Sequence, residues 1–174
     1  MNFTSVLSFD PSGNFEEGKG TTGVCLFDCK KHAIKTTNVI RAINFDLKES
    51  YWQAHIDLID KYWEQCNQNM VLVIEEYMLD PTKAMQQSYS KMETSKLIGI
   101  IQTHCFLKHI TYVMQRPSDV KTRWADHILV HKEIISRPNK RHFYLPDGVT
   151  ILNEHCRDAI RHAVHFATFK NKES

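Results

Sequence analysis

Two short apolar runs that each end in an acidic residue, with an amphipathic segment between them, constrain the fold of this chain most. Residues 2–9 lead to Asp10, and residues 70–74 lead to Glu75. Between the two runs, residues 51–66 place large apolar side chains at three- and four-residue steps, which is typical of an amphipathic helix. A strand–helix–strand crossover makes the two strands parallel, so their carboxyl ends meet at one edge of a sheet. The sequence therefore predicts that Asp10 and Glu75 lie close together.

The rest of the chain predicts an α/β fold with a mixed five-stranded sheet flanked by helices. Residues 21–27 and 33–45 are rich in β-branched side chains and form, with the first run, an antiparallel meander of three strands. The other elements expected along the chain are a long helix at 85–109, a strand at 110–114, short helices after Pro117, a mobile loop at 137–148 and a closing helix at 153–169.

The length of 174 residues fits one domain spanning 1–174. The sequence has no apolar run long enough to cross a bilayer and no leader pattern, so we expect a cytoplasmic protein that does not bind membranes. The five cysteines are odd in number and scattered, which favours reduced thiols over a disulfide framework. His127 and His131 stand four residues apart without a Cys-x-x-Cys pair, which disfavours a structural zinc site.

The closing helix adds two residues to the acidic pair. His155 and Asp158 stand three residues apart and share one helical face. Carboxylates on a rigid frame suit Mg²⁺, and two such ions about 4 Å apart can activate water for phosphodiester hydrolysis. Each acid alone also has a structural interpretation, such as a turn residue for Asp10 or an arginine partner for Asp158. The order of the three acids along the predicted elements favours a shared metal site.

Four short motifs follow one another along nearly the whole chain. They are Val6-Leu7-Ser8-Phe9-Asp10-Pro11-Ser12 with Thr22-Gly23, then Val73-Ile74-Glu75-Glu76-Tyr77, then Val120-Lys121, and finally His155-Cys156-Arg157-Asp158-Ala159. Together they resemble the motifs of RuvC-type Holliday junction resolvases. The resemblance implies an RNase H-like fold, a homodimer, and paired symmetric nicks in four-way DNA junctions with Mg²⁺ or Mn²⁺, two ions per active site. The long first loop at 15–20 resembles the compact bacteriophage enzymes, which implies a bacterial or phage-infected cell.

By this resemblance, Asp10, Glu75 and Asp158 are metal-binding catalytic carboxylates. His155 takes a position where members of the family carry an aspartate or a histidine, so it either binds metal or moves a proton. Glu76 is the rival of Glu75, but neighbouring strand residues face opposite ways, and the resemblance favours Glu75.

Several residues are expected to contact DNA. By the resemblance, Lys121 stands where the family has a basic residue beside DNA, and Tyr77 stands where an aromatic side chain meets an unpaired base; an exposed lysine and a core tyrosine are the alternatives. Residues 116–143 include seven basic and three acidic side chains, which can hold a polyanion or form a solvated face. Further phosphate contacts are expected from Lys19, Lys83, Arg123 and Lys132.

Three other functions fit these residues in part. A different RNase H-like nuclease, for RNA–DNA hybrids or DNA packaging, would use the same acids, although packaging nucleases carry a motor domain and this chain has no phosphate-binding loop. A module that binds branched DNA without cutting it would be weakened by three acids facing phosphate. A sugar-kinase-like ATP-binding fold needs two such halves and a longer chain.

Overall fold

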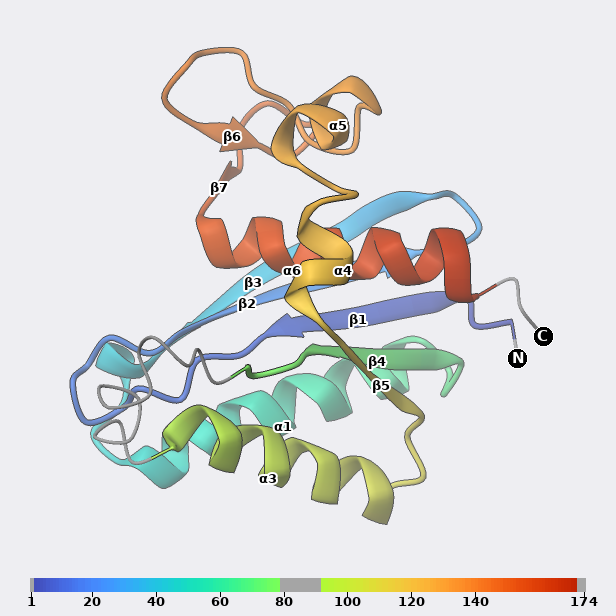
Figure 1. Cartoon of the computed structure of the whole chain (residues 1–174). Coiled ribbons are helices and arrows are strands. Elements are labelled where there is room, and N and C mark those ends of the chain that lie inside the picture. Colours follow the sequence, from blue (N-terminus) through green and yellow to red (C-terminus); the bar gives the residue numbers. More distant parts are fainter. Residues whose placement is uncertain (1, 79–91, 172–174) are drawn as a thin grey trace.

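A mixed five-stranded sheet forms the centre of the computed structural model, which describes residues 2–78 and 92–171 (Figure 1). The strands are β1 (Ser5–Asp10), β2 (Thr21–Asp28), β3 (Ala33–Arg41), β4 (Met70–Glu75) and β5 (Tyr112–Gln115), in the spatial order β3-β2-β1-β4-β5. The pairs β1–β2 and β2–β3 are antiparallel, whereas β1–β4 and β4–β5 are parallel. This arrangement confirms the predicted fold class.

Helices cover both faces of the sheet (Figure 1). On one face lie α1 (Lys48–Gln65) and α3 (Glu93–Leu107), and on the other lies α6 (Glu154–His165), which a π-helical segment continues at Phe166–Lys170. The elements on the α6 side that follow β5 are α4 (Pro117–Lys121), α5 (Asp126–His131), β6 (Phe143–Tyr144) and β7 (Ile151–Leu152). Among the helices in the described ranges, none is long and apolar enough to cross a membrane.

The side chains of β4 alternate between two hydrophobic cores. Val71 and Val73 belong to the core under α6, whereas Leu72 and Ile74 belong to the core that includes residues of α1 and α3. All four side chains are fully buried. A strand between two cores has no solvent face, which explains why its sequence is continuously apolar until it reaches Glu75 at the sheet edge.

The third strand is shorter than the sequence predicts. It ends at Arg41 rather than at residue 45. The amide of the next residue, Ala42, donates to the carbonyl oxygen of Gly20 at 2.8 Å, and a 3-10 turn follows at Ala42–Asn44. This hydrogen bond continues the β2–β3 register one step beyond the pair Thr21 and Arg41, and the 3-10 turn then ends the pairing.

The long helix and the long loop also differ from their predicted forms. Within the described residues, the helix expected at 85–109 is α3, and Met92 before it has a left-handed φ of 55°, which is not a right-handed helical conformation. Residues 79–91 lie outside the described part of the chain. The loop expected at 137–148 contains the strand β6, which pairs with β7.

A glycine lets α6 lie directly on β2. Gly23 is the register partner of Asp10 across the β1–β2 pair. A Cβ atom at Gly23 would lie 2.1 Å from the carbonyl carbon of His155 in the first turn of α6. No side chain fits in that space, so Gly23 permits the close approach that brings the first turn of α6 beside Asp10.

Gly23→Ala should therefore destabilise the protein by about 2–3 kcal/mol, since backbone would have to move away from the new methyl group. The matched control is Gly99→Ala in α3, where an added Cβ meets no atom within 4 Å. That control should stabilise the helix by about 0.5–1 kcal/mol, because alanine loses less backbone entropy than glycine. Urea unfolding measures both changes, and equal losses in the two variants would contradict the close approach at Gly23.

Candidate metal centre

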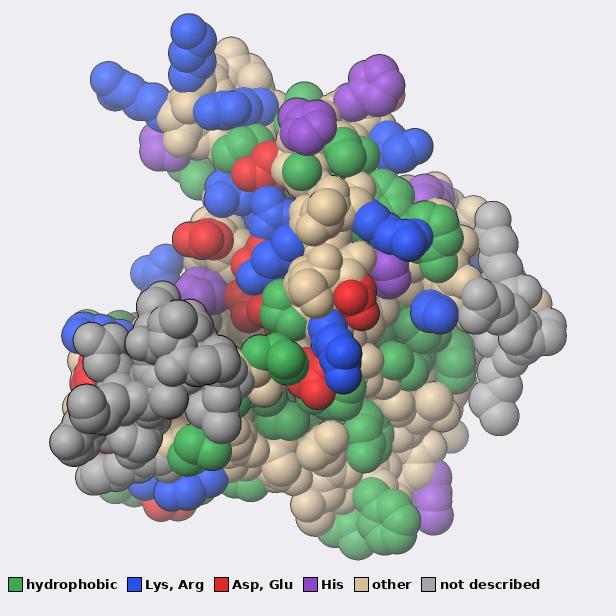
Figure 2. All heavy atoms as spheres, viewed as in Figure 1, with side chains coloured by type: hydrophobic (Ala, Val, Ile, Leu, Met, Phe, Trp, Pro, Cys, Tyr) green, Lys and Arg blue, Asp and Glu red, His purple; other side chains and the backbone are tan. Residues whose placement is uncertain are grey.

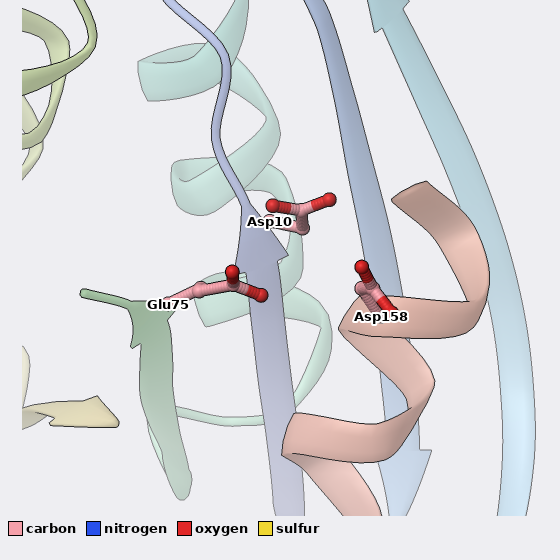
Figure 3. A group of neighbouring side chains, drawn as sticks. All are labelled: Asp10, Glu75 and Asp158. Carbon is pink, nitrogen blue, oxygen red and sulfur yellow. The ribbon is translucent and has the colours of Figure 1, made fainter. Parts of the chain in front are cut away.

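Three carboxylates from three elements converge on one space. Asp10 ends β1, Glu75 ends β4 and Asp158 lies in the second turn of α6 (Figure 3). Each contributes an oxygen, and these oxygens all lie within 4.8 Å of one another. Their side chains are 14%, 12% and 7% exposed, respectively, so water screens their mutual repulsion only in part.

The sheet and α6 fix these positions. Phe9 pairs with Ile74 in the parallel β1–β4 register, so the next residues, Asp10 and Glu75, end neighbouring strands at the same level. Ser8 lies two residues before Asp10 and so faces the same side of β1, where its hydroxyl donates to the carbonyl oxygen of Ala159 at 2.6 Å. This buried bond ties α6 to β1 next to Asp158.

Cationic side chains stand beside two of the acids. The Nζ atom of Lys121 lies 2.8 Å from Asp158 and 3.3 Å from Glu75. Partial burial alone would lower the pKa of Lys121, but its hydrogen bonds and charge interactions with the two carboxylates raise it overall. Arg161, which is buried, pairs with both Asp158 and Asp126, and its Nε donates to the carbonyl oxygen of Trp124 at 3.0 Å.

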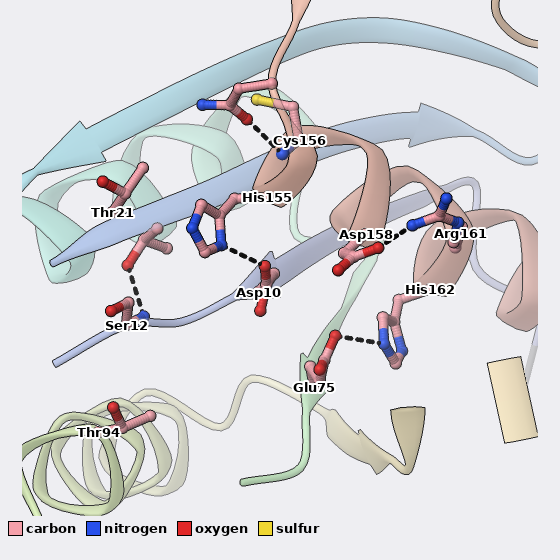
Figure 4. Close-up of polar contacts among 12 residues, drawn as sticks. Asp10, Ser12, Thr21, Glu75, Thr94, His155, Cys156, Asp158, Arg161 and His162 are labelled. Atoms are coloured by element: carbon pink, nitrogen blue, oxygen red, sulfur yellow. Dashed lines mark hydrogen bonds and ion pairs between the residues drawn. The ribbon is translucent and has the colours of Figure 1, made fainter. Parts of the chain in front are cut away.

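Histidines bond to the other oxygens. His155 Nδ1 lies 2.7 Å from Asp10 Oδ2, and His162 Nε2 lies 2.9 Å from Glu75 Oε2 (Figure 4). Burial raises the pKa of Asp10, and repulsion by Glu75 and Asp158 adds to the rise, while the bond with His155 opposes it. The same bond raises the pKa of His155 above its usual value.

Asp10 and Glu75 open onto a pocket of about 340 Å³ that also includes His155, Glu76 and Tyr77 in its lining. Tyr77 is partly buried and packs against the core of α1 and α3, and its contact with an unpaired base stays a prediction. Glu76 lies in the same lining, with one oxygen 3.4 Å from Arg116 Nε. Of the two adjacent glutamates, Glu75 is the one that joins the acidic cluster.

The other predicted DNA contacts lie apart from the acids. Lys19 pairs with Glu17 at 3.0 Å on the first loop, and the guanidinium of Arg123 lies over the ring of Phe169 at 5.3 Å. Lys132 lines a different pocket, next to β3. Lys83 lies outside the described residues.

The sequence patterns did not predict the roles of Arg161 and His162 in the acidic cluster. The arginine partner considered for Asp158 could be Arg157 or Arg161, and the structure pairs Arg161 with it. His162 stands seven residues after His155, two helical turns along the same face of α6, and this spacing is the signal that would have found it.

The donor set fits a divalent metal ion. Carboxylate oxygens at the end of a rigid sheet are the hard ligands that Mg²⁺ and Mn²⁺ prefer, and an open pocket leaves room for water and substrate. Asp10, Glu75 and Asp158 are the residues that would hold the ion, with His155 at the rim.

Comparison with known proteins places the fold. No protein-family model matches the chain, and no curated protein matches it. Among solved structures, the chain is similar to that of T. thermophilus RuvC in complex with a Holliday junction substrate, with a TM-score of 0.67 at 11% sequence identity. The match covers 94% of this chain and 92% of that one. The chain therefore has the RNase H-like fold that the sequence predicts.

Asp10→Asn should stabilise the metal-free protein, because it removes one of three repelling, poorly hydrated charges. A gain of about 1 kcal/mol raises the melting temperature by about 2–4 °C in a chain of this size. Adding Mg²⁺ should raise the melting temperature of the native protein more than that of the variant. Calorimetry in chelator and in Mg²⁺ measures this, with Asp57→Asn on the exposed side of α1 as the control. A native protein indifferent to Mg²⁺ would contradict the metal site.

Proposed function

We propose that this chain is a metal-dependent DNA endonuclease that cuts four-way junctions. The observation that carries the proposal is the cluster of three carboxylates within 4.8 Å at the strand ends of an RNase H-like sheet. One solved structure with a similar fold is a RuvC in complex with a Holliday junction substrate, which supports junction DNA as the substrate proposed here. We extend the proposal to a single nuclease domain over 1–174, related to the phage enzymes and acting in the cytoplasm.

Hydrolysis of a phosphodiester breaks the bond between phosphorus and a sugar oxygen while a water oxygen bonds to phosphorus. Asp10, Glu75 and Asp158 would bind two Mg²⁺ ions, or Mn²⁺ in their place, which supply a polarised water and neutralise charge on the departing oxygen. The ammonium of Lys121, held beside Glu75 and Asp158, is close enough to the acids to contact a phosphate oxygen bound there. His155 lines the pocket and is 41% exposed, so it can exchange a proton with solvent.

A four-way DNA junction is nearly two-fold symmetric, so cutting it symmetrically requires two active sites. We propose a homodimer, because the described residues of each chain contain one such acidic cluster and paired nicks need two clusters related by symmetry. Trp52 and Leu107 line an apolar groove between α1 and α3, and they offer one surface that a second chain can cover.

A basic lobe, defined as residues 126–152, extends the DNA surface. It leads through β7 directly into α6, so it stands next to the turn that carries His155, and Lys and Arg side chains gather at its tip (Figure 2). Arg157 of α6 contacts Asp126 at 3.4 Å and lies 4.4 Å over the ring of Phe143, which fixes the lobe to the helix. The exposed cations of the lobe are Lys132, Arg137, Lys140 and Arg141. Tyr77, Lys19, Lys83 and Arg123 stay predicted DNA contacts.

Cleavage of a synthetic four-way DNA junction tests the activity. The native protein with Mg²⁺ should make paired nicks at the junction, and Asp10→Asn should lower the rate by at least about 1,000-fold, since it removes a metal ligand. Linear duplex, flap and RNA–DNA hybrid serve as comparison substrates, and chelator serves as the metal control.

Other outcomes of this experiment would assign a different function to the protein. Tight binding of the junction without cuts in Mg²⁺ or Mn²⁺ would leave a branched-DNA-binding module. Cutting of the hybrid alone would make the protein a ribonuclease of the same fold.

The basic lobe should contribute salt-dependent affinity. Changing Arg137, Lys140 and Arg141 together to Gln should weaken junction binding in chelator and reduce the slope of log K against log salt by about 3, one for each lost phosphate contact. The control changes Lys30 and Lys31 to Gln at the β2–β3 turn, which lies at the opposite end of the sheet from Asp10. Fluorescence anisotropy at several salt concentrations measures both slopes, and a native slope in the lobe variant would remove the lobe from the DNA surface.

A further inference from the structure

A buried histidine joins two residues that are neighbours in the sheet. His162 is 0% exposed, and its Nδ1 and Nε2 lie 2.9 Å from Gln115 Oε1 and 2.9 Å from Glu75 Oε2, respectively. Glu75 and Gln115 are register partners at the ends of β4 and β5. Figure 4 shows the ring reaching from α6 to Glu75. The three side chains form a chain of contacts behind the acidic cluster.

Hydrogen-bonding capacity fixes the direction of the bond to Glu75. An ionised carboxylate only accepts, so Nε2 of His162 must carry a proton and donate it to Oε2. The amide of Gln115 can then accept from a protonated Nδ1, or its NH₂ group can turn to donate to a bare Nδ1. In the first orientation Gln115 Nε2 is buried without a partner among the described residues. Both orientations leave the same donor on Glu75.

The two carboxylate oxygens of Glu75 have different partners. Oε2 faces His162, whereas Oε1 lies 3.3 Å from Lys121 Nζ, which also contacts Asp158. Oε1 is therefore the oxygen on the side of the other acid. A glutamate side chain loses rotamer entropy when it is ordered, and a permanent donor removes that cost from the binding of an ion.

We propose that His162 is a positioning residue that holds Glu75 by Oε2 and leaves Oε1 on the side of the acidic cluster, where Glu75 would bind the metal ion, and that Gln115 fixes the ring of His162. The inference rests on the proposed metal site and deepens it. His162 has no exposed surface, so it does not reach solvent or DNA, in contrast to His155, which is 41% exposed. Its effect acts through Glu75.

Two polar variants of His162 test the inference. The amide of a glutamine extends to the former Nε2 position and keeps a donor on Glu75, whereas the shorter asparagine ends near Nδ1 and reaches only toward Gln115. Mn²⁺ alone is titrated calorimetrically into the full-length native protein and each variant, without DNA. His162→Asn should weaken Mn²⁺ binding by about 10- to 100-fold. His162→Gln should stay within about threefold of native, because the donor to Glu75 is kept.

The control is His165→Gln, one turn further along α6. His165 is also buried, at 8% exposed, and its ring lies against Phe169 at 5.2 Å rather than against an acid. Its substitution should change the melting temperature without changing Mn²⁺ affinity. If any polar substitution in α6 disturbs the site, then His162→Asn, His162→Gln and His165→Gln should all weaken Mn²⁺ binding. That result would overturn the positioning role of His162.

Gln115→Met gives a second measurement that leaves His162 in place. It should weaken Mn²⁺ binding in the same direction by a smaller factor, and it should add nothing to His162→Asn, because both changes break one chain of contacts. Native affinity in His162→Asn, or equal losses in the Gln and Asn variants, would overturn the inference alone. A native protein that binds no Mn²⁺ would overturn the proposed metal site as well, so the two failures are distinguishable.

Discussion

The mutual repulsion of three clustered carboxylates is the constraint on which the rest of this structure depends. Two unit charges 4 Å apart repel by about 4 kcal/mol at an effective dielectric constant of 20, and the oxygens of Asp10, Glu75 and Asp158 lie within 4.8 Å of one another. Such a cluster persists only on a frame that holds the backbone and with positive or donating groups beside it. The two cores and the parallel β1–β4 pair supply the frame.

Helix α6 supplies most of the groups that offset this repulsion. His155, Asp158 and His162 stand at steps of three and four residues, so one face of the helix contacts the space between all three acids. Arg161 lies on the adjacent side and links Asp158 to Asp126. The helix therefore contributes one acid together with a partner for each acid. The close packing of α6 on Gly23 allows this, since a longer distance from the sheet would break the contacts of His155 with Asp10 and of His162 with Glu75.

The same helix connects the acidic cluster to the basic lobe. Asp126 at the start of α5 receives both Arg157 and Arg161, and Phe143 of β6 lies between the guanidinium groups of Arg137 and Arg157, 4.7 and 4.4 Å from its ring. Charges at the tip and acids at the sheet are thus parts of one packed unit. A fold shared at 11% identity with a RuvC structure does not specify these contacts, so the chemistry of this chain has to be argued from its own side chains.

The sequence by itself determined the three-stranded meander, the parallel crossover and the two acids at neighbouring strand ends, because apolar periodicity and chain direction are local properties. It also placed His155 and Asp158 on one helical face. Only the tertiary structure decided which cations and donors meet the acids. His162 and Glu75 are 87 residues apart in the chain, and their contact depends on how closely α6 packs on the sheet. That distance is set by the fit of two packed surfaces, which no local pattern in the sequence encodes.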